Sequence, residues 1–405
     1  MTFKTRSTIA CFLLSNLSIP AFSQSNVIIY GAIDAGVMSI SGLPIGNIGY
    51  LPTTKISSGK TVFKDGGSGA SVWGLRGKED LGGGLSAIFQ LQAAYNSSTG
   101  VVGAGNSSGQ VSFFNHFSTV GLAGGFGEIR VGRQASPVFF SLAATDVRQA
   151  RNFGSALTAL VGLNSASGAY IGNNSNAAFS SIYNDRSINY RSPTWNNTTF
   201  TLHYAFGPSG GKEDSQQSAS ILYKNGGLSL SGLIYNGYGN NLSSATTAFT
   251  LREGNAVAGA AAARSAGFSE SANTNRLGGA GALYSRDKYT VSAGYYLARN
   301  PSKAIVPGGS ASMNQWSIGV GYRMNALNNL TAAYYRIDDN TNNGHYAEQL
   351  VLGFDYFLSK RTMAYLGGAI TKNKGENMGL SPLYASPVAA NKNNAAVMLG
   401  IRHTF

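Results

Sequence analysis

The sequence predicts an all-β protein, an antiparallel transmembrane β-barrel of about sixteen strands. Short segments in which apolar and polar residues alternate recur down the whole chain. Each is about as long as the ~10 residues that a tilted strand needs to cross a membrane. The connections between them alternate short and long without exception. After residue 23 no run of ~18 apolar residues occurs, which excludes transmembrane helices.

The first 23 residues have the pattern of a secretory signal peptide. Lys4 and Arg6 precede an apolar run over 9–17, and small residues follow at Ala21 and Ser23. The run is too short to span a bilayer, which needs ~20 residues. We therefore expect cleavage after Ser23 and export of the chain.

The mature chain, residues 24–405, is predicted to be one domain. The only cysteine, Cys11, lies in the signal segment, so no thiol remains for a disulfide or a metal. Of 30 Lys and Arg residues, two lie in that segment, which leaves 28 against 17 acidic residues. The full chain has 53 Gly, 21 Tyr and 20 Phe residues and only 12% charged residues, which does not fit a secreted globular protein. No stretch resembles a linker or the Leu- and Ile-rich core of a soluble domain.

The predicted strands follow from period-two alternation, with boundaries good to about three residues. They are 27–38, 70–80, 85–95, 114–123, 127–135, 185–192, 199–206, 217–225, 227–236, 275–285, 289–299, 314–324, 329–338, 347–358, 362–372 and 396–405. Helical periodicity is nearly absent; the segment 147–162 alone is predicted to contain a short helix.

The connections indicate which end of the barrel is which. The short ones, such as "NG" at 225–226 and "SKR" at 359–361, are tight turns. The long ones are 39–69, 96–113, 136–184, 207–216, 237–274, 300–313, 339–346 and 373–395. Outer-membrane barrels have this asymmetry, with short periplasmic turns and long extracellular loops. A soluble sandwich, the alternative fold, has no reason to keep every long loop at one end.

The two faces of the strands predict lipid on one side and water on the other. In 289–299, Tyr289, Val291 and Tyr295 share one face, and Thr290 and Ser292 share the other. In hydrocarbon each unpaired backbone group costs several kcal/mol, so the sheet must close, pairing the first strand with the last. The chain is patterned as a strand up to its final residue, Phe405. We expect that residue to be the signal read by the machinery that inserts barrels.

Five motifs carry a family resemblance. They are "VIIYGAIDAGV" near the mature N-terminus, "WGLRGKEDLGGGLSAIFQLQ" at 73–92, "VGLAGGFGEIRVGRQ" at 120–134, "LGFDYFLSKRT" at 352–362 and "GIRHTF" at 400–405. Together and in this order they resemble the general diffusion porins of Gram-negative β-proteobacteria. The sequence departs from that pattern at Val72, Gln92 and His116.

The resemblance implies a trimeric barrel in the outer membrane whose third loop, residues 136–184, folds into the lumen and narrows it. A loop longer than ~15 residues without its own structure is usually functional. The expected partners are a second and third copy of the chain, outer-membrane lipid and lipopolysaccharide, the insertion machinery, and small hydrophilic solutes and anions.

The candidate site is the charged lining of this channel. Cations expected to face the lumen are Arg76, Lys78, Arg130, Arg191, Lys224, Arg323 and Arg402; the acids with the same orientation are Asp34 and Asp355. The infolded loop adds Asp146, Arg148 and Arg151. Arg133 is off this parity and joins the constriction only by resemblance. A surplus of Arg and Lys along a pore favours anions.

Nothing in the sequence indicates catalysis, a cofactor, a metal or nucleic-acid binding. The four histidines, His116, His203, His345 and His403, have no neighbouring Asp, Ser or metal-ligand spacing. The leading hypothesis is a passive diffusion channel that weakly prefers anions. The alternatives are a substrate-specific channel for phosphate or organic anions on the same scaffold, and a closed adhesin or structural barrel.

Overall fold

A computed structural model of the chain describes most of the barrel and part of its loops. The described residues are 26–43, 59–102, 113–162, 182–207, 210–212, 215–238, 256–265, 274–299, 311–375, 378–383 and 388–405. Across these residues, none of the helices has the length and apolar character needed to span a membrane.

Strands make up nearly all of the regular structure. They are β1 (Asn26–Ile40), β2 (Lys60–Asp65), β3 (Ser71–Gly82), β4 (Leu85–Tyr95), β5 (Phe117–Gly124), β6 (Gly127–Ala135), β7 (Tyr183–Arg191), β8 (Thr198–Ala205), β9 (Gln216–Asn225), β10 (Leu228–Tyr238), β11 (Thr274–Arg286), β12 (Tyr289–Arg299), β13 (Ser312–Arg323), β14 (Asn328–Asp339), β15 (Tyr346–Phe357), β16 (Thr362–Lys374) and β17 (Asn394–Thr404). The helices are α1 (Pro137–Thr145), α2 (Ala156–Gly162) and α4 (Ala256–Ser265).

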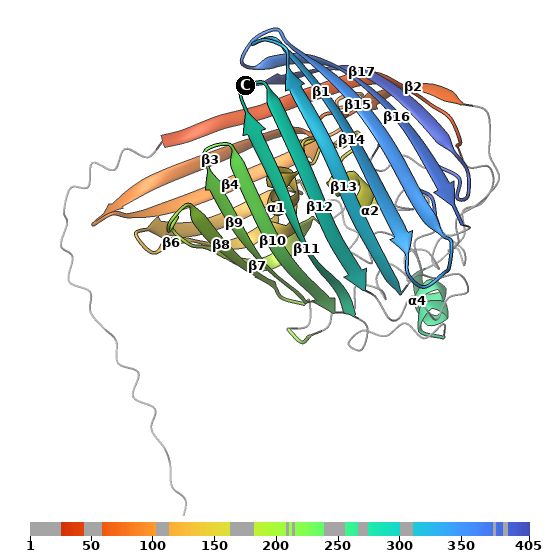
Figure 1. Cartoon of the computed structure of the whole chain (residues 1–405). Helices are drawn as coiled ribbons and strands as arrows, with labels where there is room; N and C mark the ends of the chain where they lie inside the picture. Colours follow the sequence, from red (N-terminus) through yellow and green to blue (C-terminus); the bar gives the residue numbers. More distant parts are fainter. Residues whose placement is uncertain are drawn as a thin grey trace, which may run out of the picture.

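The strands form one closed antiparallel sheet (Figure 1). Its seam is the pairing of β1 with β17, from Ala32 opposite Thr404 to Ile40 opposite Ala396. Beyond this ladder, the N–H of Phe405 donates to the carbonyl of Gly31 and the N–H of Gly31 donates back, both at 3.1 Å. The predicted closure of the first strand on the last is confirmed.

The wall is sixteen strands wide although seventeen segments are present. β2 and β3 lie in line along the same edge of β1: β3 pairs with its first half and β2 with its second. The sequence prediction omitted β2 because it placed the whole of 39–69 in a loop. The remaining predicted strands are confirmed, with ends shifted by a few residues.

The predicted faces are also confirmed. On β13, Ile318 and Val320 point outward and are 56% and 55% exposed, whereas Ser317 and Gly319, which alternate with them, point inward and are buried. On β8, Phe200 and Leu202 point outward in the same way, and His203 points inward. The outer surface is therefore an apolar band, as a lipid-facing wall requires.

Candidate functional site

The described part of the third loop that holds its two helices, residues 136–162, runs inside the barrel, where α1 contacts β8–β12 and α2 contacts β13 and β14 (Figure 1). Ser136 caps α1 by accepting the N–H of Val138 at 3.4 Å, and Pro137 occupies its first turn. The helix expected within 147–162 covers only 156–162 as α2, since 147–150 form turns and 151–155 are irregular, with Phe153 in a β-bridge to Leu383. The helix α1 was not predicted.

Small residues on the inner wall make room for this loop. A Cβ added to Gly319 would lie 2.4 Å from Val147, and one on Gly367 would lie 2.8 Å from Phe153. At Gly353 a Cβ would meet the guanidinium of Arg148 at 1.9 Å. These strand glycines allow the loop backbone to approach the wall closely.

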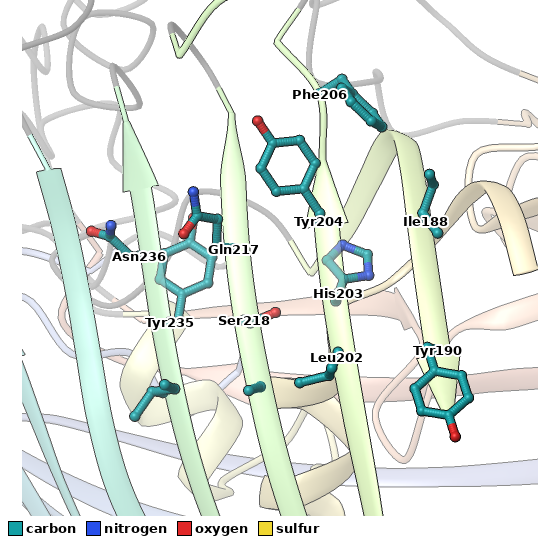
Figure 2. Close-up of a pocket in the computed structure, with 12 residues that line it drawn as sticks. Ile188, Tyr190, Leu202, His203, Tyr204, Phe206, Gln217, Ser218, Tyr235 and Asn236 are labelled. Carbon is teal, nitrogen blue, oxygen red and sulfur yellow. The ribbon is translucent and has the colours of Figure 1, made fainter. Parts of the chain in front are cut away.

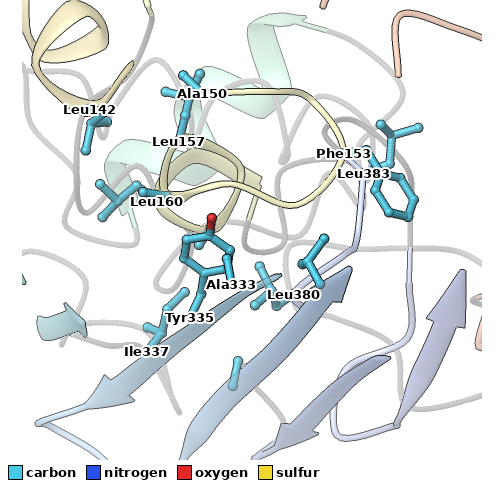
Figure 3. Packing of buried hydrophobic residues seen from close by; sticks show 14 of the residues in the cluster. Leu142, Ala150, Phe153, Leu157, Leu160, Ala333, Tyr335, Ile337, Leu380 and Leu383 are labelled. Atoms are coloured by element: carbon cyan, nitrogen blue, oxygen red, sulfur yellow. The ribbon is translucent and has the colours of Figure 1, made fainter. Parts of the chain in front are cut away.

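An apolar cluster fixes the loop to the wall inside the lumen (Figure 3). Leu142, Leu157 and Leu160 of the loop are at most 6% exposed and pack with Tyr335 and Ile337 of β14. The lumen is therefore not polar all round, which corrects the assignment of every inward face to water. Burial of each such side chain stabilises the infolded loop by about 1.5–3 kcal/mol.

Asp146 holds the turn between the two helices. Its carboxylate accepts the N–H groups of Ala156 at 2.7 Å and Arg148 at 3.1 Å, and the hydroxyl of Tyr335 at 2.9 Å. Burial raises the pKa of Asp146. The hydrogen bonds favour the charged carboxylate and lower the pKa, but burial has the larger effect. Because Asp146 is 5% exposed, its charge acts on the loop fold and is shielded from the open lumen.

The two arginines of the loop are bonded as well. Arg148, 2% exposed, donates to the carbonyls of Gly154 and Phe153 at 3.1 and 3.0 Å and to Thr331 on the wall at 2.7 Å. Burial, followed by the neighbouring Arg151, lowers the pKa of Arg148 to about 10, so it remains a cation at neutral pH. Arg151 forms a two-pronged ion pair with Asp355 on β15, at 2.7 and 2.8 Å.

A second infolded segment, residues 66–70 between β2 and β3, meets the loop. The carboxylate of Asp34 accepts the N–H groups of Ser68 and Gly69 at 3.0 and 2.8 Å. Arg402 pairs with the same carboxylate at 3.2 Å. On its other side the carbonyl of Gly67 accepts the N–H of Phe153 at 3.0 Å. This segment therefore ties the loop to the seam of the barrel.

Several inward cations, two of them on β3, have no carboxylate partner. Arg76 lies over the ring of Tyr30, with 5.2 Å between Cζ and the ring centroid. Arg130 donates to Gln90 at 3.1 Å and pairs with Glu128. In the part of the chain that the structure describes, no carboxylate lies within 4.0 Å of five inward cations: Arg76, Lys78, Arg191, Lys224 and Arg323.

Arg133 differs from the others in its surroundings. It keeps the backbone parity of the outward-facing Val131. Its guanidinium bonds Asp185 and the carbonyl of Asn115, and its side chain is 10% exposed. Its charge is therefore paired and buried near the extracellular end of β6.

Five inward charges on the described strands were missed from the sequence, among them Asp339, which shares the inward parity of Tyr335 and Ile337 on β14. Glu128 and Asp80 share the inward faces of β6 and β3, and Lys60 and Lys64 lie opposite the inward positions Ile40 and Gly36 of β1. Parity with Arg130 and Lys78 was a sufficient signal for Glu128 and Asp80. Because three are acidic and two basic, the surplus of positive charge falls by one and remains positive.

A groove of about 540 Å³ lies on the other side of the wall, over β7–β10 (Figure 2). Ile188, Leu202 and Ile234, which border it, are 42%, 55% and 65% exposed and belong to the outward face. Its floor is the small residue Ala219. The groove is part of the apolar outer band and does not open into the lumen.

Comparison with known proteins agrees with this architecture. Residues 8–376 match a family described as Gram-negative porin. The chain is 29% identical to outer membrane porin protein 32 of Delftia acidovorans, over 99% of both chains. It is 24% identical to an outer membrane porin of Bordetella pertussis, over 99% of this chain and all of the other.

Two solved structures share the fold. An anion-selective porin from Comamonas acidovorans matches with a TM-score of 0.69 at 23% identity, over 94% of this chain and 100% of that one. The trimer form of OmpT from Vibrio cholerae matches with a TM-score of 0.60 at 13% identity, over 94% of this chain and 99% of that one.

Proposed function

The chain belongs to the family of Gram-negative porins and forms a passive channel across the outer membrane, and we propose that this channel weakly prefers anions. The observation that carries the proposal is the charge asymmetry around the constriction. Strand β3 of the wall holds Arg76 and Lys78 without a carboxylate within 4.0 Å among the described residues. The sequence of the loop, 136–184, contains a single acid, Asp146, which is buried.

The paired charges support the same sign of selectivity. Asp34, Asp355 and Glu128 are each bonded to an arginine, so they contribute little field of their own to the lumen. Low-dielectric walls focus the field of the remaining cations on the water between them. The structural relative from Comamonas acidovorans is described as anion-selective, which is consistent with this proposal.

Three further features belong to the proposal. The first 23 residues act as a signal peptide that is cleaved on export. The protein is a homotrimer, whose contacts use the outer faces of the first strands and of the last, where the side chains are small or aliphatic. Phe405 is the residue read by the insertion machinery. The trimer form of OmpT supports the second point by analogy of fold.

Single-channel recording of the purified protein in a planar bilayer tests the function. A passive channel gives a conductance that rises in proportion to salt concentration. The alternative, a channel specific for phosphate or organic anions, gives a conductance that saturates and is blocked by its substrate. A bilayer that stays closed after insertion would contradict both and favour a structural barrel.

A further inference from the structure

The helix α1 carries an aromatic ring that its packing against the wall leaves uncovered. The helix lies against β8–β12. The residues that it buries are Pro137, Val138, Ser141, Leu142 and Thr145. Phe140 of the same helix is 50% exposed. Because successive residues of a helix are about 100° apart, Phe140 falls on the face opposite the buried one. Its ring therefore points away from the wall and into the lumen.

The neighbouring side chain holds the ring of Phe140 in place. Phe139 packs edge-on against it, with ring centroids 5.4 Å apart and an interplanar angle of 78°. Phe139 is itself partly buried against the apolar cluster that fixes the loop. An exposed ring forgoes the stability that its burial would contribute. The ring of Phe140 is therefore a fixed apolar surface that a solute in the lumen can contact.

The strand across the lumen from this helix is β1. The hydroxyl of Ser231 on β10 donates to the carbonyl of Ser141, beside Phe140, at 3.3 Å. When β2 and β3 are counted as one of the sixteen positions in the wall, β10 is eight strands from β1 in both directions. In a closed barrel such strands are diametrically opposite. Phe140 therefore faces β1 and its neighbour β3.

Phe140 also lies at a depth similar to that of Tyr30 on β1. Ser231 is the fourth residue of β10 from the end at the short turns, and Tyr30 is the fifth residue of β1 from the same end of the barrel. The strands of a barrel share one tilt, so equal counts from one end give similar depths. The ring of Phe140 and the inward side chain of Tyr30 therefore face each other across the narrowed part of the lumen.

Tyr30 holds an exposed cation at this point of the wall. The guanidinium of Arg76 lies over its ring, with 5.2 Å between Cζ and the ring centroid. The hydroxyl of Tyr30 donates to Gln92 at 3.0 Å and accepts a hydrogen bond from Gln90 at 2.8 Å. Arg76 is exposed, and among the described residues no carboxylate lies within 4.0 Å of it. Its N–H groups are therefore available to an anion that passes between this wall and α1.

We propose that the lumen between Phe140 and Arg76 is a binding site for aromatic carboxylates. The guanidinium of Arg76 binds the carboxylate through charge-assisted hydrogen bonds. The ring of the solute packs edge-to-face on Phe140, an arrangement that stabilises aromatic pairs beyond the area they bury. Both groups are needed, because acetate has no ring and a neutral phenyl compound has no charge. The inference rests on the proposed function, an anion-preferring channel, and names the class of anion that the channel retains longest.

Block of the single-channel KCl current by sodium benzoate tests this, with the protein purified from outer membranes and inserted in a planar bilayer at pH 7. Acetate and cyclohexanecarboxylate are the other arms, since both carry the same charge and neither has an aromatic ring. Benzoate should block wild type at the lowest concentration of the three. Phe140→Leu, which keeps an apolar side chain on α1, should raise the half-blocking concentration of benzoate by about two- to tenfold. Arg76→Gln should raise it by about fivefold, the effect of one close charge pair in water.

Two further variants separate the ring from the fold of the loop. Phe140→Tyr keeps an aromatic ring and should be blocked by benzoate as wild type is. The matched control is Phe200→Ala, which removes an outward ring that is 43% exposed on β8 and should leave the block unchanged. Equal block of wild type and Phe140→Leu by benzoate would overturn the proposal, and so would equal block of wild type by benzoate and cyclohexanecarboxylate. A wild-type reversal potential in KCl of the sign set by potassium would instead contradict the proposed anion preference, because that measurement contains no benzoate.

Discussion

The charge of the pore lining comes from a few side chains that lack partners. Arg76 packs on Tyr30 and has no carboxylate within 4.0 Å among the described residues. Lys78, two residues further along β3, faces the same way and likewise has no carboxylate within that distance. In contrast, Arg130, Arg151 and Arg402 are neutralised by Glu128, Asp355 and Asp34. Arg76 and Lys78 should therefore make the largest contribution to the electric field in the lumen beside β3.

Replacing Arg76 and Lys78 together by Gln should shift the reversal potential in a dilute KCl gradient toward cations. Two charges 4 Å apart interact by about 1 kcal/mol in water, which corresponds to about a fivefold change in the local concentration of each ion, in opposite directions for anions and cations. Conductance should stay similar or rise. Replacing Arg361 in a periplasmic turn by Gln is the control and should leave the potential unchanged. An unchanged potential in the double variant would place the selectivity elsewhere.

Asp146 should control the width of the channel through the fold of the loop. In Asp146→Ala the N–H of Ala156, the N–H of Arg148 and the hydroxyl of Tyr335 lose their acceptor. Each buried donor left unsatisfied costs about 1–3 kcal/mol. We expect larger and noisier single-channel currents and faster proteolysis within 136–184, while the barrel itself stays folded.

The matched control for Asp146 is Tyr335→Phe, which removes one donor and keeps the carboxylate. Its currents should lie between those of wild type and Asp146→Ala. Wild-type currents in Asp146→Ala would show that the apolar cluster around Leu142 and Leu157 holds the loop without this carboxylate.

At the scale of elements, the alternation of apolar and polar residues predicts the strands well. It does not predict which side chains pack against one another inside the barrel. The outward Ile318 and Val320 and the pairing of β1 with β17 follow from period two and from the need to close the sheet. β2 does not, because its six residues, "KTVFKD", are short and charged, and they form a strand only where β1 offers them an edge. The burial of Val147 and Arg148 is also invisible in the sequence, since it depends on Gly319 and Gly353 of the wall, which are far away along the chain.

Variants of Phe405 should show whether its ring is recognised by the insertion machinery or whether the residue only stabilises the pairing of β17 with β1. Its backbone exchanges two hydrogen bonds with Gly31, and its ring lies against that residue. Deletion of Phe405 removes both the bonds and the ring, whereas Phe405→Ala removes the ring alone. If the ring is the signal, both variants lower the yield of protein in the outer membrane, and Thr404→Ala as control does not. If Phe405→Ala reaches the outer membrane in normal yield and the deletion does not, the residue acts only through its backbone hydrogen bonds to Gly31.

At the scale of the whole molecule, the outer faces of the first strands should hold the subunits together. Val37 on β1 and Ile318 on β13 are both outward and about half exposed, at 49% and 56%. A lysine at either position costs about 2–4 kcal/mol in the lipid midplane. Only Val37→Lys lies in the proposed contact, so cross-linking of detergent extracts should yield trimers for wild type and Ile318→Lys and monomers for Val37→Lys. Monomeric wild-type protein would contradict the trimer.

The sign of the reversal potential of the wild-type channel tests the central claim most directly. The protein is inserted in a planar bilayer between dilute KCl solutions of unequal concentration, and the potential at zero current is measured. A weak anion preference predicts a potential of the sign set by chloride. Raising the salt should reduce it, because the Debye length falls from about 10 Å at 0.1 M to about 3 Å at 1 M. A potential of the sign set by potassium in dilute salt would contradict the account.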